Sequence, residues 1–392
     1  MKKKPDLTII LISVILTMIG TVMIFSASSP TCAMLSSYHN DPYFYLKKQL
    51  IHIFIGIIMF WVCAIVNIKD MKKYGHVLFV LTLFLLAIVF IPGIGVSSKG
   101  STRWIGIAGF SFQPSELAKI VCVIFIARYL SKRAENIQLL PQFLIITGWM
   151  ILTAGLIGIS DLGTAIAIFF VFMIMLYISG ANKLHLTCLT GLGVLGVTAL
   201  VLLGGNSYRV KRLISFLDPW KYSQDMGYQV CQSLIAIGSG GFGLGLGESR
   251  QKFLYLPEQH TDFIFAIIGE ELGIVGTIII VLLFCFLLHR GLKIASETSD
   301  LFLSLLAIGC TLMITLQAFM NIGIVIGILP CTGIPLPFIS YGGTSLIVTL
   351  SMMGILFNIS QYCSREGIGL HLEDENSSQD YDYSECLDAE EN

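Results

Sequence analysis

The chain has 392 residues, of which 55% are hydrophobic and only 12% carry a charge, and its formal net charge is −1. A soluble protein this apolar could not cover its surface with polar side chains, so the composition indicates a polytopic membrane protein. The lysines and arginines are scattered among apolar runs, which excludes the concentrated basic footprint of a nucleic-acid-binding protein. The 10 cysteines form no CxxC pair and show no metal-type spacing, so neither a disulfide framework nor a protein metal site is predicted.

Apolar segments long enough to cross a bilayer recur along the chain. A spanning helix needs about 20 mostly apolar residues, because its backbone hydrogen bonds must be satisfied within the segment. This rule predicts an all-α membrane domain of about ten spans over residues 1–365, and the first span is too long for a cleaved signal peptide. The predicted spans are 7–27, 48–66, 74–91, 114–130, 142–159, 163–179, 184–203, 263–288, 301–328 and 343–362.

Lysine and arginine in the short connections predict the orientation. With the amino terminus inside, most of them fall on the cytoplasmic side, as the positive-inside rule requires. Both termini are then expected in the cytoplasm, and the long connection 204–261, between the seventh and eighth spans, faces outward. Residues 366–392 are rich in aspartate, glutamate and serine, which is typical of a disordered acidic tail.

Charged residues gather around the start of the fourth span. Pro114 signals a helix start, and Glu116 and Lys119 are spaced to meet on one helix face. Because an unpaired charge at the edge of the hydrocarbon is costly, the pair should face protein or water. An ion pair that joins two helices and a ligand role for Lys119 are equally compatible with this spacing. Arg103, next to a tryptophan, fits an interfacial anchor or a substrate contact.

Two further acidic and basic features lie in the outer connections. Asp161 falls in a very short turn, where capping of the following helix explains it. Residues 206–220 alternate basic and apolar side chains, which predicts an amphipathic helix in the membrane interface. Arg209 and Arg212 on this helix either anchor it or bind an anionic headgroup, since arginine donates two parallel hydrogen bonds to phosphate.

A glycine-dense segment, 237–252, follows in the same connection. It matches no nucleotide-binding fingerprint, because no strand precedes it and it faces outward. A mobile loop and a loop that closes over a substrate remain equal alternatives.

Three ionisable residues, Glu258, His260 and Asp262, stand together just before the eighth span. Capping of that span explains a single aspartate, but a cluster of ionisable groups at a membrane mouth favours a functional site. Glu270 lies roughly 80° around the helix from Asp262 and about 12 Å deeper, so it is expected to line the same cavity. The connection 329–345 is rich in proline and glycine, so it must be buried in protein or line a wet cavity. We expect it to fold back against the segment that carries Asp262.

Several stretches resemble the SEDS family of bacterial cell-wall polymerases, over most of the chain up to about residue 362. They are TRWI, FQPSELAK, DLGTA, YRVKRLISFLDPW, GYQVCQSLIAIGSGG, GLGESRQKFLYLPEQHTDFIFAIIGEELG and LPCTGIPLPFISYGGTS. GLGESRQKFLYLPE is closer to the division branch (FtsW) and its sporulation relative (SpoVE) than to the elongation branch (RodA). Three positions depart from the family pattern. Ile159 and Ser160 precede the DLGT motif, where relatives usually have Glu or Gln and then Pro, and Thr332 replaces a lysine that some members carry.

The resemblance implies a peptidoglycan glycosyltransferase that joins lipid II at the outer face of the inner membrane, in septal wall synthesis. Its partners would be a class B penicillin-binding protein and other divisome membrane proteins. Asp262, the aspartate of the HTD motif, is implied as the catalytic residue, with Arg103, Glu116 and Lys119 as further site residues. We expect Asp262 to act as the base of an inverting transfer that releases undecaprenyl diphosphate.

Cationic side chains are expected to stabilise the leaving diphosphate, and a divalent cation such as Mg²⁺ is a candidate cofactor because diphosphates favour one. The candidate substrate-binding residues are Arg103, Glu116, Lys119, Arg209, Arg212, Glu258, His260 and Glu270. The alternatives are an elongation-type polymerase and a lipid II flippase or other transporter. A flippase needs a polar path through the bilayer centre, whereas the charges here cluster near the outer mouth, which favours the enzyme.

Overall fold

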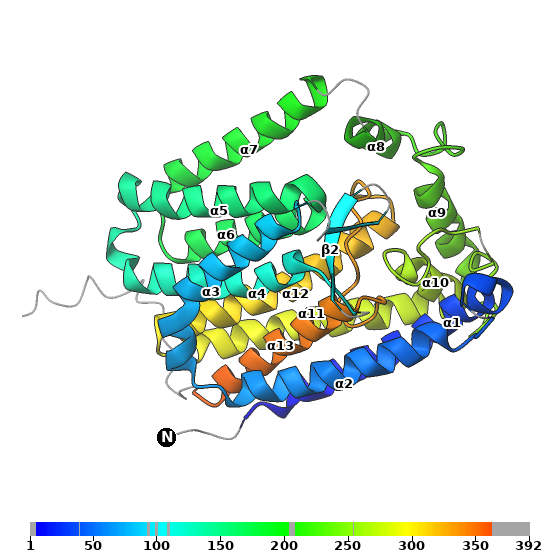
Figure 1. Ribbon diagram of the computed structural model, residues 1–392, viewed down its shortest axis with the longest axis horizontal. Coiled ribbons are helices and arrows are strands. Elements are labelled where there is room, and N and C mark those ends of the chain that lie inside the picture. Colours follow the sequence, from blue (N-terminus) through cyan, green and yellow to red (C-terminus); the bar gives the residue numbers. More distant parts are fainter. Residues whose placement is uncertain are drawn as a thin grey trace, which may run out of the picture.

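The structure, a computed structural model, describes residues 5–38, 40–91, 95–98, 101–107, 110–203, 208–253 and 255–362. Its long helices lie side by side in one bundle, with the short elements gathered at one end (Figure 1). The expected acidic tail at 366–392 lies outside the described residues.

The described chain contains a helix for every predicted span. They are α1 (Leu7–Met34), α2 (Phe44–Ile65), α3 (Ile68–Ile88), α4 (Pro114–Lys132), α5 (Leu140–Ser160), α6 (Leu162–Ile178), α7 (Lys183–Leu203), α10 (Ile264–Glu271) with α11 (Gly273–Ser296), α12 (Leu301–Val325) and α13 (Gly343–Ser360). Among the described residues, 7 helices are long and apolar enough to span a membrane: α1, α2, α3, α5, α11, α12 and α13. The prediction of an all-α polytopic membrane fold is therefore confirmed.

Burial separates central helices, among them α4, α12 and α13, from an outer ring. In the apolar windows of α12 and α13, 78% and 89% of the residues are buried, against 22% for α3 and α11. The outer helices expose large apolar side chains such as Phe54, Ile65 and Phe84. In water such exposure would be unfavourable, so these faces are the lipid-facing surface of a multi-pass membrane protein.

The eighth predicted span is broken, and the prediction of one continuous helix at 263–288 was wrong. α10 ends at Glu271, and α11 begins at Gly273, whose φ of +65° interrupts the helix. A Cβ at Gly273 would overlap the backbone of Phe242 and Gly243, so the glycine-dense loop packs directly onto the break. The apolar pattern continues across residue 272. It could not reveal the break, because the break depends on packing against residues 241–243.

Two connections between the long helices hold structure that hydropathy did not indicate. A small antiparallel sheet consists of β1 (Gly95–Ser98), β2 (Ser101–Ile107) and β3 (Phe110–Phe112), in the order β1-β2-β3. The long connection folds into α8 (Tyr208–Leu217) and α9 (Tyr228–Gly240). The helix expected within 206–220 is thus confirmed. α8, α9 and α10 lie on the right-hand side of Figure 1, and β2 lies nearer its middle.

Candidate active site

The segment His260–Asp262, called the HTD segment below, is held in place through its own three backbone carbonyls. They accept hydrogen bonds from Tyr341 N, Ser340 Oγ and Asn321 Nδ2, at 2.9, 2.6 and 2.7 Å in chain order. Two of these donors belong to the connection between α12 and α13, and Asn321 belongs to α12. The prediction that the proline- and glycine-rich connection folds back against this segment is therefore confirmed.

Buried polar side chains extend this support. Asn321 is fully buried, and its Nδ2 also donates to the carbonyl of Ile334 at 2.7 Å. Ser340 Oγ accepts from Leu336 N at 2.7 Å while it donates to the HTD segment. The Asn321 amide and the Ser340 hydroxyl thus join the segment His260–Asp262 to the connection 329–345. Neither segment has the regular backbone hydrogen bonds of a helix, so these side chains fix the backbone of Asp262.

The Asp262 side chain is half-buried and points toward Gly333 of the same connection. Asp262 Oδ2 and Arg103 Nη1 lie 3.4 and 4.0 Å from the point that a Cβ on Gly333 would occupy. Gly333 has a φ of +74°, so glycine both relieves backbone strain and leaves room where the two charges converge. Asp262 does not cap the following helix, because α10 begins at Ile264 and its N-cap is Phe263.

A bulge in the small sheet presents Arg103. Its neighbour Trp104 pairs with Val96 and Thr102 pairs with Ser97, so Arg103 is the extra residue of β2. Such bulges redirect side chains and are frequent beside active sites. Arg103 lines a cavity of about 10 Å³ with Pro114 and Ser115, which joins the sheet to the start of α4.

The electrostatic surroundings of Cys331 place Arg212 near the same site. Burial raises the pKa of the Cys331 thiol; the Arg212 guanidinium opposes this rise, and the Asp262 carboxylate adds to it. Both charges therefore act on one sulfur in the connection that packs against Asp262. Arg209 also lies on α8, but its side chain is outside the described ones.

Glu116 and Lys119 form the predicted pair, at 2.6 Å and almost fully buried. Lys119 Nζ also donates to Gln317 Oε1 on α12 at 2.7 Å, and Gln317 Nε2 donates to the carbonyl of Pro335 at 2.9 Å. The pair thus joins α4 to α12 and, through Gln317, to the connection beside Asp262. This geometry favours the helix-joining alternative, and a direct substrate contact by Lys119 stays a prediction.

Asp161 is the N-cap of α6, as expected. Its carboxylate accepts from Thr164 N at 3.1 Å, and Gln113 Nε2 donates to it at 3.2 Å. Gly163, in the first turn of α6, packs against Thr332 and Ile334. The start of α6 is therefore a further wall of the same polar region.

Glu258 and His260 shape the HTD segment. Glu258 has a φ of +58°, and its carboxylate accepts from Thr261 Oγ1 at 2.8 Å. The His260 ring packs on Tyr45 of α2, with centroids 4.3 Å apart. The turn and the ring contact anchor the segment from two sides. A substrate contact by either residue remains a prediction.

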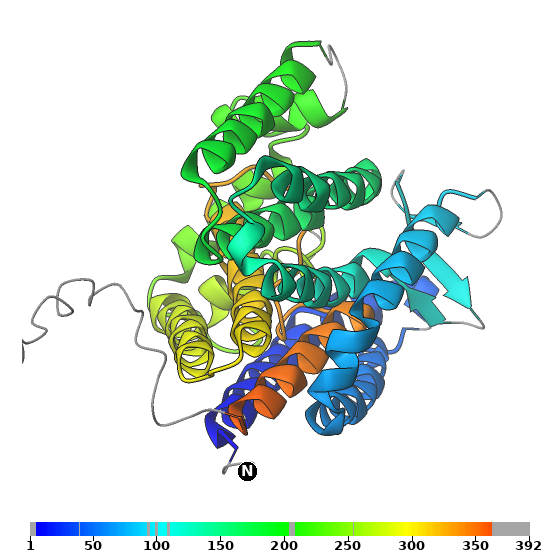
Figure 2. The same cartoon turned by 90° about the vertical axis from the view of Figure 1, so that its left-hand side faces the viewer.

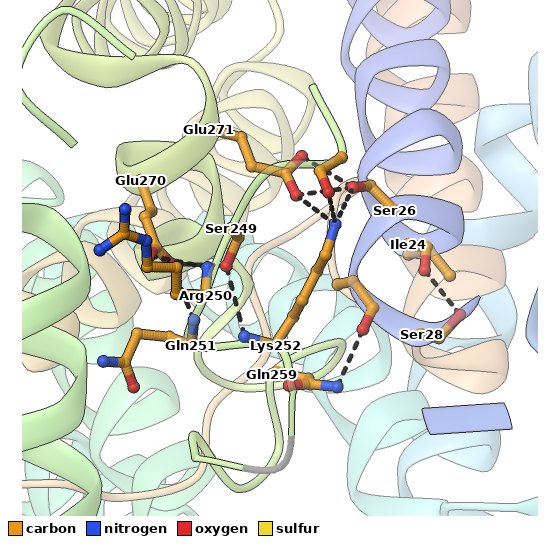
Figure 3. A network of polar contacts seen from close by, with 12 residues as sticks. Ile24, Ser26, Ser28, Ser249, Arg250, Gln251, Lys252, Gln259, Glu270 and Glu271 are labelled. Carbon is orange, nitrogen blue, oxygen red and sulfur yellow. Dashed lines mark hydrogen bonds and ion pairs between the residues drawn. The ribbon is translucent and has the colours of Figure 1, made fainter. Parts of the chain in front are cut away.

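Glu270 and Glu271 have a different setting, shown in Figure 3. The Glu270 carboxylate accepts hydrogen bonds from Ser249 Oγ, from Arg250 N at 2.9 Å and from Gln251 N at 3.3 Å. The carboxylate thus contacts the Ser249 side chain and the backbone amides of Arg250 and Gln251. The loop at 249–251 therefore covers the Glu270 carboxylate, which helical phase could not show. A substrate contact by Glu270 stays a prediction.

The Glu271 carboxylate binds Lys252 Nζ at 3.0 Å and Ser26 Oγ of α1 at 2.7 Å. Lys252 also donates to the carbonyl of Gly247, and Leu244 N and Gly245 N donate to the backbone carbonyls of the two glutamates. We call Ser249, Lys252, Glu270 and Glu271 the glutamate clamp. Because it holds the glycine-dense loop on α10 through buried groups, it favours a fixed loop over a mobile one.

Sequence reasoning missed Asn321, Gln317 and Ser340. The signal was present, because Asn321 and Gln317 are polar residues four positions apart inside an apolar span, where such residues indicate function or helix contacts. Within the described ranges, no group of three or more His, Cys, Asp or Glu side chains is arranged to hold a metal ion.

Comparison with known proteins decides the family. A sequence model of the family described as "Cell cycle protein", which covers FtsW, RodA and SpoVE, matches residues 6–365. The chain belongs to this family, the SEDS family. Stage V sporulation protein E of Bacillus subtilis (strain 168) is 42% identical over 92% of this chain and 98% of its own length. A protein of Geobacter sp. (strain M18) named "Probable peptidoglycan glycosyltransferase FtsW" is 40% identical, over 91% of this chain and 96% of its own length.

Solved structures show the same SEDS fold. A chain of a peptidoglycan synthase complex, solved in work on the coordination of polymerization and crosslinking, has a TM-score of 0.76 at 26% identity, covering 91% of this chain and 97% of its own. The rod shape determining protein RodA of Thermus thermophilus has a TM-score of 0.68 at 25% identity, covering 91% and 98%. The predicted family and fold are therefore confirmed.

Proposed function

We propose that this SEDS protein is a peptidoglycan glycosyltransferase that joins lipid II units into glycan strands, with Asp262 as the general base. One observation carries the assignment of the base: a half-buried carboxylate faces Arg103 across Gly333, while the backbone of its segment is held by three hydrogen bonds. A carboxylate in a fixed position can take a proton from the acceptor. A cationic side chain beside it can stabilise the anionic group that leaves.

The proposed reaction is one inverting displacement. Asp262 takes the proton from the 4-hydroxyl of the acceptor N-acetylglucosamine, and the resulting oxygen attacks C1 of the donor N-acetylmuramic acid. The bond from C1 to the diphosphate oxygen breaks, and undecaprenyl diphosphate leaves with the electron pair. No covalent enzyme intermediate forms, so one carboxylate suffices.

We assign the leaving diphosphate to Arg103 and Arg212, whose guanidinium groups suit phosphate oxygens. Lys119 already binds Glu116 and Gln317, so we assign that pair first to holding α4 against α12. A divalent cation on the diphosphate remains a candidate, and no step above depends on it. Polyprenyl tails would lie against the apolar faces of the outer helices.

The remaining assignments follow from the charge distribution and the relatives. We propose cytoplasmic termini, an outward-facing site, and a location in the inner membrane at the division septum. A class B penicillin-binding protein is the proposed partner, supported by the similarity to a chain of a peptidoglycan synthase complex. Identities near 40% to FtsW and SpoVE relatives, against 25% to RodA, favour septal or sporulation synthesis over elongation.

The test uses the protein purified with its transpeptidase partner and labelled lipid II, with glycan strands resolved by electrophoresis. Wild type is expected to make strands, and Asp262→Asn to make none above background. Equal strand formation by the variant would refute the assignment of the base. If neither protein polymerised but both moved lipid II across vesicle membranes, the protein would be a flippase.

A further inference from the structure

A second polar site lies at the end of the bundle away from Asp262, where a cavity of about 510 Å³ opens between α3, α4 and α5. Its lining on α4 runs from Phe125 to Lys132 and includes the C-cap Arg133, whereas the start of α4 at Pro114 belongs to the Asp262 end. Figure 2 looks onto this end of the bundle, with α3 in light blue. We call this cavity the basic groove.

The mouth of the basic groove is cationic. Arg128, Lys132, Arg133 and His76 line it, and the described lining includes no Asp or Glu. Arg128 is tethered by one hydrogen bond from Nη1 to the carbonyl of Lys73, at 2.7 Å. The Arg133 guanidinium sits 4.5 Å from the centre of the Tyr129 ring, which orients it. Positioned arginines of this kind favour an anion that accepts several hydrogen bonds.

The inner wall of the basic groove is apolar and rigid. Phe125 stacks on Phe79, with centroids 3.9 Å apart, and Trp149 meets Phe79 edge-on at 6.0 Å. Ile145 and Trp149 also line the groove and remain 48% and 37% exposed. At 1.5 Å per residue they lie about 7 and 14 Å along α5 from its start, so the apolar wall runs from the helix ends into the bundle.

We propose that the basic groove binds an anionic phospholipid. Its phosphate contacts Arg128, Lys132 and Arg133, and the first part of an acyl chain lies along Phe125, Ile145 and Trp149. The helix ends lie at headgroup depth in a spanning bundle, and basic pockets between helices recognise anionic headgroups there. Inorganic phosphate would contact the basic residues but leave the apolar wall uncovered. A phospholipid covers both, so we favour it over free phosphate as the ligand. The inference is independent of the glycosyltransferase assignment.

The experiment measures retained lipid by native mass spectrometry of the full chain. The protein is equilibrated in detergent with phosphatidylglycerol or phosphatidylcholine of identical acyl chains. Wild type is expected to prefer phosphatidylglycerol about tenfold or more. Lys132→Gln with Arg133→Gln, both exposed at the mouth, should abolish the preference. The matched control, Lys183→Gln with Lys293→Gln, removes two exposed charges elsewhere and should retain it.

Four outcomes would overturn the proposal. The double variant could keep the preference, or the control could lose as much of it as the double variant does. Millimolar inorganic phosphate could displace the lipid, which would make free phosphate the ligand. Finally, the lipid could bind only to a chain truncated after Tyr362, in which case the acidic tail at 366–392 would be the occupant. Equal melting temperatures of both variants without added lipid show that a loss is not caused by unfolding.

Discussion

The HTD segment and the glutamate clamp are neighbours in the chain, but their carboxylates differ in burial and in surroundings. Asp262 is half-buried, its backbone carbonyl is held by Asn321, and its carboxylate faces Arg103 across a glycine. Glu270 and Glu271 are each 1% exposed, and serine, lysine and backbone donors of this chain bind their carboxylates.

The difference separates two structural acids from the proposed base. A carboxylate that is fully buried must be satisfied by the protein itself, because leaving it unpaired costs several kcal/mol. A carboxylate that is bound by donors of the protein and buried away from the substrate is also a poor proton acceptor. In the segment His260–Asp262, three hydrogen bonds to backbone carbonyls fix the position of Asp262, and its side chain is only half-buried.

The largest expected effect is that of Asp262→Asn on catalysis. General base catalysis contributes about 10²- to 10⁴-fold to a rate, so strand synthesis should fall by at least about 100-fold. Because the held groups are backbone carbonyls, the melting temperature should stay within about 2 °C of wild type. The rate is measured with labelled lipid II and the stability by thermal unfolding in detergent. A large loss of stability would show that the carboxylate is structural, like Glu270.

Lys252→Met should damage the glutamate clamp without touching the proposed chemistry. It leaves Glu271 buried without its cation, which costs about 3–5 kcal/mol of unfolding free energy. Adding Glu271→Gln should recover part of this loss, because the amide can still hydrogen-bond Ser26. Denaturant unfolding of the single and double variants measures the coupling. Additive effects would contradict the clamp as a coupled unit.

Asn321→Leu tests whether backbone support is what positions Asp262. It leaves the carbonyls of Asp262 and Ile334 without this donor and should cost about 2–3 kcal/mol. Asn358 is a matched control, because this fully buried residue donates in the same way to the carbonyls of Cys63 and Val66. Both variants should lose similar stability.

Only Asn321→Leu should lower kcat for strand synthesis, by about tenfold, with a smaller change in KM, because a misplaced base affects the reaction step more than binding. Steady-state kinetics of the two variants below their melting temperatures decide the question. A similar fall in kcat for Asn358→Leu would attribute the loss to general destabilisation.

The smallest expected effect concerns the break between α10 and α11. Gly273→Ala places a Cβ against the Phe242 and Gly243 backbone at a φ of +65° and should cost about 2 kcal/mol. Gly148→Ala, where a Cβ meets nothing within 4 Å in the middle of α5, should instead gain about 0.5–1 kcal/mol. Thermal unfolding of both compares them directly, and equal shifts would contradict the close packing of the loop.

Much of the fold could be predicted because hydrocarbon imposes a local rule. A span must satisfy its own backbone, so consecutive residues show its length and apolar composition. Each predicted span corresponds to one described helix, except 263–288, which corresponds to two. Local chemistry likewise predicted the cap at Asp161 and the pair of Glu116 with Lys119, since both depend on neighbours in one helix.

What only the tertiary structure decided depends on segments far apart in the chain. Helical phase placed Glu270 beside Asp262, but the loop at 249–251 covers it. The break at Gly273 follows from packing against residues 241–243, and Asn321 reaches Asp262 across 59 positions. The sequence by itself determined which segments form the spanning helices and which residues are ionisable. The pairing of those residues was set by long-range packing, which buries Glu270 and Glu271 against donors of this chain and leaves Asp262 half-buried.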